Sequence, residues 1–139
     1  MSYKIISKFI KDISFEIPNI HAFAMLEKEI SNYSLNFDIK SSTYKKNIIA
    51  VDTLLKISPT QDVKHKILTE ITYTALVSIA EKFEDKKELE KIILIKIPTE
   101  IYPDLYETFV YLFKQAGIKN IEIYKKVDFE KLYNEKKNN

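Results

Sequence analysis

The side chains that could carry out chemistry in this sequence are few and widely separated. The two histidines, His21 and His65, lie far apart, cysteine is absent, and Gly117 is the only glycine. The absence of cysteine excludes disulfides, thiol catalysis, zinc fingers and iron–sulfur clusters, and one glycine cannot build a glycine-rich phosphate loop. No serine has the context of a nucleophile elbow. We therefore expect a binding protein with no enzymatic activity, no metal and no cofactor.

Length and composition indicate a soluble protein of one domain. The 139 residues are 45% hydrophobic and 30% charged, which suits a single domain over residues 1–139. All 22 basic residues are lysine, against 20 acidic residues, and a near-neutral chain without arginine is poorly suited to sequence-specific nucleic-acid binding. The most apolar window, Ile92 to Ile97, is far shorter than the ~20 residues that span a bilayer, and the N-terminus has no signal-peptide pattern. We expect a cytoplasmic protein with no direct membrane insertion.

Apolar residues at every second position predict four strands in the first two thirds of the chain. The four segments run from about Ile5 to Ile17, from Tyr33 to Lys40, from about Asn47 to Ile57, and from Ile67 to Ile79. In the first segment, the odd positions Ile5, Phe9 and Ile13 are expected to share one face. Short turns join some of these segments, so we expect an antiparallel sheet. The stretch from Ile20 to Ser31 fits either a helix or a long crossover loop.

The last third of the chain is predicted to be helical. A charged stretch from Asp85 to Glu90 leads into the apolar window, and Pro98 marks the opening of a new helix because proline is tolerated in a first turn. Gly117 is the expected C-cap of that helix, and Asp128 is the expected N-cap of a short final helix. A sheet followed by helices belongs to the α+β class.

The helix that opens at Pro98 carries more apolar surface than one sheet face requires. Outside its apolar stripe it also has Tyr102, Tyr106, Val110 and Tyr111. A helix that covers a sheet needs an apolar stripe only about 100° wide. The excess predicts burial by a partner subunit or a binding surface, and the alternative is a helix sandwiched inside one domain.

Two pairs of residues on the predicted strands could form a partner surface. Asp12 and Glu16 lie four residues apart on the first strand and therefore point the same way. Leu68 and Glu70 share the even face of the fourth strand. Taken alone, such pairs also fit a solvated sheet face.

The stretch from Lys8 to Asn19, KFIKDISFEIPN, resembles the N-terminal signature of SecB, the bacterial protein-export chaperone family. In that signature a strand reads Lys-Asp-(Ile/Leu)-Ser-Phe-Glu-x-Pro-x. Further matches follow in order over nearly the whole chain: Phe23 in the crossover segment, Leu35 to Asp38 in the second strand, Ile97 to Glu107 at the opening of the long helix, and Val127 to Tyr133 around the start of the final helix. The lysine-rich end of the chain differs from the acidic tail typical of the family.

The resemblance implies a fold, an assembly and a function. The implied fold is a four-stranded antiparallel sheet in Greek-key order, with a long helix and a short C-terminal helix packed on one side. The implied assembly is a homotetramer built as a dimer of dimers. The implied function is that of an ATP-independent holdase, which binds unfolded preproteins in a hydrophobic groove and passes them to SecA, the export motor. Two alternatives stay open: a SecB-like chaperone dedicated to one client, such as the antitoxin of a toxin–antitoxin pair, and a non-chaperone α+β interaction module.

The resemblance also assigns roles to individual positions. The residues expected to line the client groove are Phe23, Leu26, Tyr33, Leu35, Phe37, Ile101, Tyr102 and Phe129. The residues expected to contact SecA are Asp12, Glu16, Leu68 and Glu70. The residues expected at the oligomer interface are Thr69, Ile71, Tyr73, Phe109 and Phe113.

Overall fold

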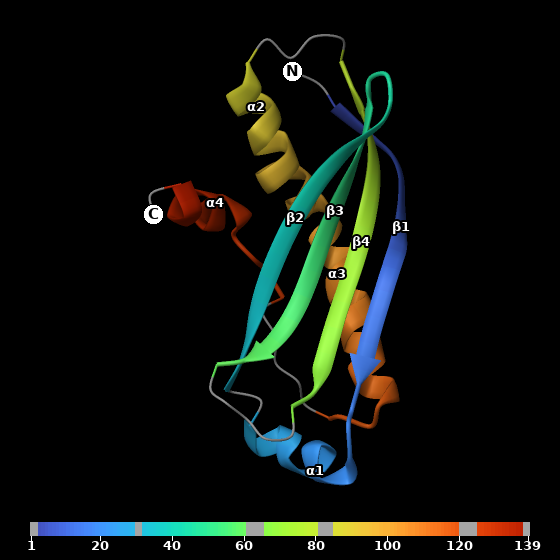
Figure 1. Ribbon diagram of the computed structural model, residues 1–139, viewed down its shortest axis with the longest axis vertical. Helices are drawn as coiled ribbons and strands as arrows, with labels where there is room; N and C mark the ends of the chain where they lie inside the picture. Colours follow the sequence, from blue (N-terminus) through green and yellow to red (C-terminus); the bar gives the residue numbers. More distant parts are fainter. Residues whose placement is uncertain (1–2, 30–31, 61–65, 81–84, 120–124, 138–139) are drawn as a thin grey trace.

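The computed structural model describes residues 3–29, 32–60, 66–80, 85–119 and 125–137. Its strands are β1 (Tyr3–Glu16), β2 (Tyr33–Lys45), β3 (Ile48–Pro59) and β4 (Leu68–Ile79). They form one antiparallel sheet in the order β1-β4-β3-β2 (Figure 1). Because β2, β3 and β4 are successive neighbours and β1 lies beside β4, the order is a Greek key. The predicted sheet is confirmed.

The connection from β1 to β2 contains helix α1 (Ile20–Glu29), so the helical alternative for this stretch is correct. Its first turn is capped by Asn19, whose Oδ1 accepts a hydrogen bond from the Ala22 amide at 2.8 Å. Ala22 and Leu26 are buried, and α1 lies at one end of the sheet (Figure 1).

The sheet has one buried face and one open face. Along β3 and β4 the odd-numbered residues lie beneath the helices, and Val51, Leu55, Ile71 and Val77 are fully buried. The even-numbered residues point the other way, as the exposed Lys56 does. This alternation is the period-two pattern that the sequence displays.

Strand β1 does not keep one register along its length. Its pairing with β4 shifts between Ile5 and Ser7, and again between Ile10 and Asp12. Each β-bulge adds one residue and turns the following side chains to the other face. As a result, Ile5 and Ile13 pair with buried-face residues of β4, whereas Phe9 pairs with Thr74 on the open face. The expectation that Phe9 shares a face with Ile5 and Ile13 is therefore wrong.

The helical third begins earlier than the prolines suggest. Helix α2 (Lys86–Lys91) continues through a π-helical turn, η2 (Ile92–Lys96), into α3 (Ile97–Gln115) without a break. Pro98 lies in the first turn of α3 as predicted. Because the chain is already helical before it, Pro98 does not open a separate helix. Pro103 also fits within α3.

Both predicted caps are confirmed. Gly117 adopts a φ of 83°, and its amide donates to the Lys114 carbonyl at 3.0 Å while the Ile118 amide donates to the Phe113 carbonyl at 3.0 Å. This pair of bonds is the Schellman motif, which favours glycine because of its positive φ. The final helix, α4 (Phe129–Lys137), is capped by Asp128, whose Oδ1 accepts from the Lys131 amide at 3.0 Å.

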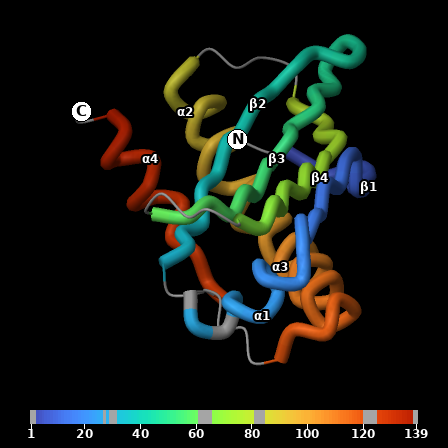
Figure 2. The backbone as a smooth tube through the Cα atoms, turned by 60° about the horizontal axis from the view of Figure 1, so that its bottom comes forward, coloured from blue at the N-terminus to red at the C-terminus, as the bar shows by residue number. Residues whose placement is uncertain are grey.

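Helix α3 packs against the buried face, alongside β4 and β1 (Figures 1 and 2). Edge strand β1 is tied to it by two polar contacts. The Tyr3 hydroxyl donates to Glu100 Oε2 at 3.0 Å, and Lys8 Nζ lies 2.7 Å from Asp104 Oδ2. These contacts hold β1 over α3 even though several of the apolar side chains of β1 remain exposed.

Candidate functional site

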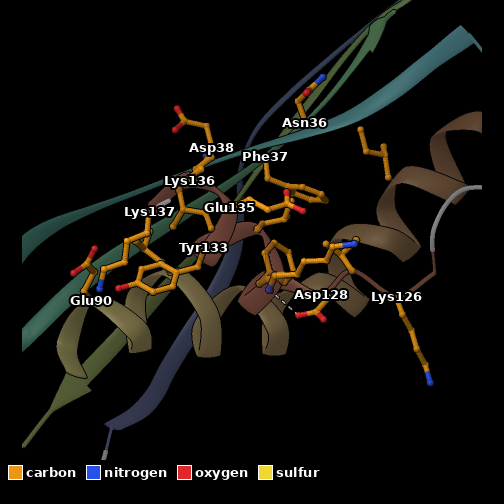
Figure 3. Close-up of a pocket in the computed structure, with 17 residues that line it drawn as sticks. Asn36, Phe37, Asp38, Glu90, Lys126, Asp128, Tyr133, Glu135, Lys136 and Lys137 are labelled. Carbon is orange, nitrogen blue, oxygen red and sulfur yellow. Dashed lines mark hydrogen bonds between the residues drawn. The ribbon is translucent and has the colours of Figure 1, made fainter. Parts of the chain in front are cut away.

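A groove with a volume of about 870 Å³ lies between β2, the start of the helical third and α4 (Figure 3). One wall is the stretch from Leu35 to Ile39 of β2. The opposite wall is α4 with the residues that precede it from Lys126, and Glu90 and Leu94 contribute from α2 and η2. Three of the residues predicted to bind the client, Leu35, Phe37 and Phe129, line this groove.

The groove is built over a cluster of aromatic rings. The ring centroid of Phe37 lies 5.1 Å from that of Phe129 and 5.7 Å from that of Tyr102, in edge-to-face geometry. Tyr102 comes from α3 and Phe129 from α4, so this cluster joins β2, α3 and α4. Burial, with a smaller contribution from the neighbouring Tyr106, raises the pKa of Tyr102 to about 12. Aromatic rings clustered in this way provide a large apolar contact area.

The rim of the groove carries charges of both signs. Its basic residues are Lys126, Lys131, Lys136 and Lys137, and its acidic residues are Asp38, Glu90, Asp128 and Glu135. Asp128 is engaged as the cap of α4, and Asp38 lies 3.8 Å from Lys40. The groove therefore combines an apolar floor with a rim that carries charges of both signs.

Tyr133 forms part of the groove wall and was not among the predicted site residues. It is buried, and its hydroxyl finds no hydrogen-bond partner among the described residues. The Lys137 ammonium lies 5.6 Å from the centre of its ring. Leu132 and Leu94 were also missed. The helical spacing from Phe129 to Leu132 and Tyr133 was the signal that could have identified two of these three residues.

The other residues predicted to bind the client lie outside this groove. Leu26 and Ile101 are buried in the core and line no part of the groove. They were predicted to be accessible because apolar spacing identifies one face of an element but does not show what covers that face. Tyr33 is half-buried, and its hydroxyl accepts a hydrogen bond from the Ile67 amide at 3.1 Å. Phe23 lines a separate, open hollow of about 440 Å³ with Ile17, Asn19, Ile20 and Ala116.

The four residues predicted to contact SecA are brought together on the open face of the sheet. Strands β1 and β4 are neighbours, with Glu16 paired to Leu68 and Ser14 paired to Glu70. Asp12 lies further along β1 on the same face, opposite Thr72. Leu68 is 41% exposed, and Glu70 Oε1 lies 3.4 Å from Lys56 Nζ. The result is a surface with three acidic side chains, one of them paired with Lys56, and the exposed Leu68, which we call the Leu68 patch.

The residues predicted at the oligomer interface lie mostly inside the single chain. Thr69, Ile71, Phe109 and Phe113 are buried between the sheet and α3, and Tyr73 is half-buried. These buried side chains belong to the core between the sheet and α3, so they are not accessible to a second subunit. The large apolar side chains that β1 exposes are Ile6, Phe9, Ile10 and Ile13.

Within the described part of the chain, no helix is long and apolar enough to cross a membrane.

Comparison with known proteins adds a family to this geometry. The family model described as preprotein translocase subunit SecB matches residues 1–139. The chain is 44% identical over 137 residues to the protein-export SecB protein assigned in Pelagibacter ubique (strain HTCC1062), with 99% of this chain and 98% of that protein covered. The chain belongs to the SecB family.

More distant relatives agree with this membership. The protein-export protein SecB of Parvibaculum lavamentivorans is 26% identical over 135 residues, which cover 96% of this chain and 77% of that protein. The Mycobacterium tuberculosis Rv1957 SecB-like chaperone, solved in complex with a ChAD peptide from the Rv1956 HigA1 antitoxin, superposes with a TM-score of 0.68. That match covers 90% of this chain and 88% of the other at 11% identity, so it shows a shared SecB-like fold.

Proposed function

We propose that this SecB-family protein is an ATP-independent holdase that binds unfolded preproteins in the groove between β2 and α4 and delivers them to SecA. The observation that carries the proposal is the groove itself, a furrow with an aromatic floor and a mixed charged rim. Family membership supports a role as a protein-export chaperone. The residues that contact the client in this proposal are Leu35, Phe37 and Leu132, and the buried rings of Phe129 and Tyr102 support them from beneath.

The energetics suit a transient complex. Burial of apolar surface contributes roughly 25 cal/mol per Å², and ordering an unfolded chain offsets much of this gain. Several weak contacts along a groove can therefore hold a chain without locking it in place. Selectivity for unfolded chains follows because folded proteins bury the apolar segments that the groove would contact.

Delivery to SecA is proposed to use the Leu68 patch on the open face. Its acids, Asp12, Glu16 and Glu70, would attract the lysine-rich, zinc-holding tail typical of SecA, and Leu68 would provide an apolar anchor. Such exposed charges mainly raise the rate at which the two proteins associate and contribute less to their final affinity. Because the patch and the groove lie on different elements, a chaperone could hold its client and contact SecA at the same time.

Assembly as a cytoplasmic homotetramer is part of the same proposal. Ile6, Phe9, Ile10 and Ile13 expose apolar surface along the free edge of β1, and Tyr111 does so on α3. Phe9 lies on the open face and Ile10 and Ile13 on the buried face, so the apolar side chains flank this edge on both sides. Several large exposed apolar side chains on one strand favour association with a partner. A second copy that covers β1 would bury them.

A chaperone dedicated to one client is the second candidate function. The structural similarity to the Mycobacterium tuberculosis chaperone, which was solved with a peptide from an antitoxin, favours it. Both candidates use the same groove, and they differ in whether SecA is a partner.

The test of the proposed function has two arms. A chemically unfolded protein is diluted into buffer with this chain and without nucleotide, and light scattering reports aggregation. Suppression near equimolar concentration is expected, and no suppression would contradict the holdase. SecA is then captured on the immobilised chain: retention supports export delivery, and its absence would favour the dedicated-client chaperone.

A further inference from the structure

The second bulge of β1 decides which of its side chains reach the open face of the sheet. The ladder with β4 passes from Ile10 to Asp12, so Lys11 is the extra residue of this bulge. If the pairing that holds before the bulge continued, Asp12 would lie opposite Ile71, on the buried face. The structure instead places Asp12 opposite Thr72, on the open face. The acidic part of the Leu68 patch on β1 therefore depends on one added residue.

The apolar side chains around the bulge do not determine which residue is the extra one. The ring of Phe15 meets that of Phe113 edge-on, with 5.2 Å between the centroids, and this contact fixes the register after the bulge. The pairing of Ile10 keeps the register before it. Either Lys11 or Asp12 could be the extra residue while both registers stay unchanged. If Asp12 were the extra residue, Lys11 would take its place in the ladder.

The side chain of Lys11 reaches across β4 and ends on β3, two strands away in the sheet (Figure 1). Its Nζ donates to Asp52 Oδ2 at 2.9 Å, and Asp52 Oδ1 accepts a hydrogen bond from the Thr74 hydroxyl at 2.7 Å. Asp52 and Thr74 lie opposite each other in the ladder between β3 and β4, and Thr74 is buried. One carboxylate on β3 is therefore held by β4 and in turn holds β1.

This contact favours the observed position of the bulge. With Asp12 as the extra residue, Lys11 would move along β4 toward Thr72 and away from Asp52. A partly exposed ion pair contributes little to the stability of a fold. A small preference is nevertheless enough to choose between two bulge positions that share their apolar contacts.

We propose that Lys11 is a positioning residue, which through Asp52 keeps the extra residue of the bulge at position 11 and so holds Asp12 in the ladder on the open face. The inference rests on the proposed delivery to SecA, in which Asp12 belongs to the contact surface. The Lys11 ammonium is itself paired with Asp52, so it does not oppose a positively charged partner.

Lys11→Met separates this role from a simple effect of charge. The methionine keeps an apolar side chain of similar length and removes the ammonium. Loss of a positive charge beside an acidic surface would by itself strengthen the capture of a lysine-rich partner, whereas displacement of Asp12 weakens it. We expect SecA to bind immobilised Lys11→Met about fivefold more weakly than the wild type, and Lys11→Arg, which keeps the charge, to bind within about twofold of it.

Lys56→Met provides the matched control on the same face. Lys56 lies opposite Glu70 in the regular ladder between β3 and β4, and its Nζ is 3.4 Å from Glu70 Oε1. Its loss removes the same charge without releasing the bulge, so SecA capture should be unchanged or stronger. Thr74→Val removes the hydroxyl that orients Asp52, changes no charge, and should weaken capture in the same direction as Lys11→Met. Equal effects of Lys11→Met and Lys56→Met would overturn the inference.

Nuclear magnetic resonance of selectively labelled protein reads the position of the bulge without any partner. In the wild type, the backbone protons of Asp12 should lie close to those of Thr72. In Lys11→Met, those of position 11 should take their place. Suppression of client aggregation should stay within about twofold of the wild type, because the groove lies on other elements.

Two outcomes of the resonance measurement would overturn the inference. In the first, Asp12 stays opposite Thr72 in Lys11→Met, which would show that Lys11 does not hold the bulge even if capture falls. In the second, the bulge moves and capture is undiminished, which would show that the position of Asp12 does not govern partner binding. A wild-type chain that captures no SecA would contradict the proposed delivery, and the resonance measurement would still decide whether Lys11 holds the bulge.

Discussion

The ring of Phe37 on β2 meets the ring of Phe129 on α4 edge-on, with 5.1 Å between their centroids. This contact joins the free edge of the sheet to the final helix and forms the floor of the groove. Phe37→Ala should weaken binding of an unfolded client about tenfold, because it removes aromatic area from that floor. Anisotropy with a labelled unfolded client measures the change. Tyr44→Ala, which truncates an exposed aromatic residue on the same strand outside the groove, should leave binding unchanged.

The hydroxyl of Tyr133 is expected to reduce stability. A buried polar group without a hydrogen-bond partner carries a desolvation cost of about 1–3 kcal/mol. Tyr133→Phe keeps the ring and should raise the free energy of unfolding by about 1 kcal/mol in urea titrations. A loss of stability would show that this hydroxyl has a partner in solution.

The raised pKa of Tyr102 predicts a loss of stability at alkaline pH. The folded chain keeps the proton until about pH 12, whereas the unfolded chain releases it near pH 10. The unfolded state therefore binds fewer protons between these values, and the free energy of unfolding falls as pH rises through this window. The pKa shift of Tyr102 contributes on the order of 2 kcal/mol to the free energy of unfolding below pH 10, and this contribution is lost by about pH 12. Urea unfolding at about pH 9 and about pH 11.5 should show a smaller difference for Tyr102→Phe than for the wild type; an equal difference would contradict the assignment.

How far the sequence predicts the fold depends on whether the signal is local. Gly117 and Asp128 are identified from the sequence because a positive φ and an N-cap impose their own residue types. The position of Phe9 is missed because a bulge adds one residue without any compositional mark. The continuous path through η2 is missed for a similar reason, since Pro98 is compatible with either arrangement.

In the candidate site, too, local sequence signals identify some residues, whereas features set by long-range packing are missed. Phe37 and Phe129 were identified through their aromatic character and family position, and they meet in the structure. Leu26 and Ile101 share that apolar character but line no part of the groove, and Phe129 is itself buried beneath it. Which apolar residues stay accessible depends on packing between elements distant in sequence. Tyr133 was missed although it lies four residues after Phe129, on the same face of α4.

If the Leu68 patch binds SecA and the groove binds the client, substitutions in the patch should impair SecA binding alone. Glu70→Lys or Asp12→Lys should abolish SecA capture, because either reversal places a positive charge where a lysine-rich partner is proposed to bind. Added salt should weaken capture by the wild type. Glu130→Lys, on an exposed position of α4, is the matched control. Capture that survives both reversals, or that ignores salt, would refute this surface and favour the dedicated-client chaperone.

The exposed edge of β1 predicts how assembly can be disrupted. Ile71 is fully buried in its own chain, so a lysine there would unfold the chain before it tested any interface. Ile13 is 40% exposed on the edge strand, and Ile13→Lys should leave the fold intact while splitting the assembly into smaller species. Sedimentation velocity measures size, and circular dichroism confirms folding. Tyr44→Lys provides a control on the opposite edge strand. Full-size species for Ile13→Lys would place the interface elsewhere.

Photo-crosslinking from the groove tests most directly whether it holds unfolded polypeptide. A photoreactive amino acid is placed at the position of Leu132, in the groove wall, and separately at the position of Tyr44, outside it. Each protein is irradiated with one client in its unfolded form and in its native form. The groove at Leu132 is predicted to crosslink the unfolded client strongly and the native client weakly, with little crosslinking from Tyr44 to either. Equal crosslinking from the two positions, or equal crosslinking of the two client forms at Leu132, would contradict the account.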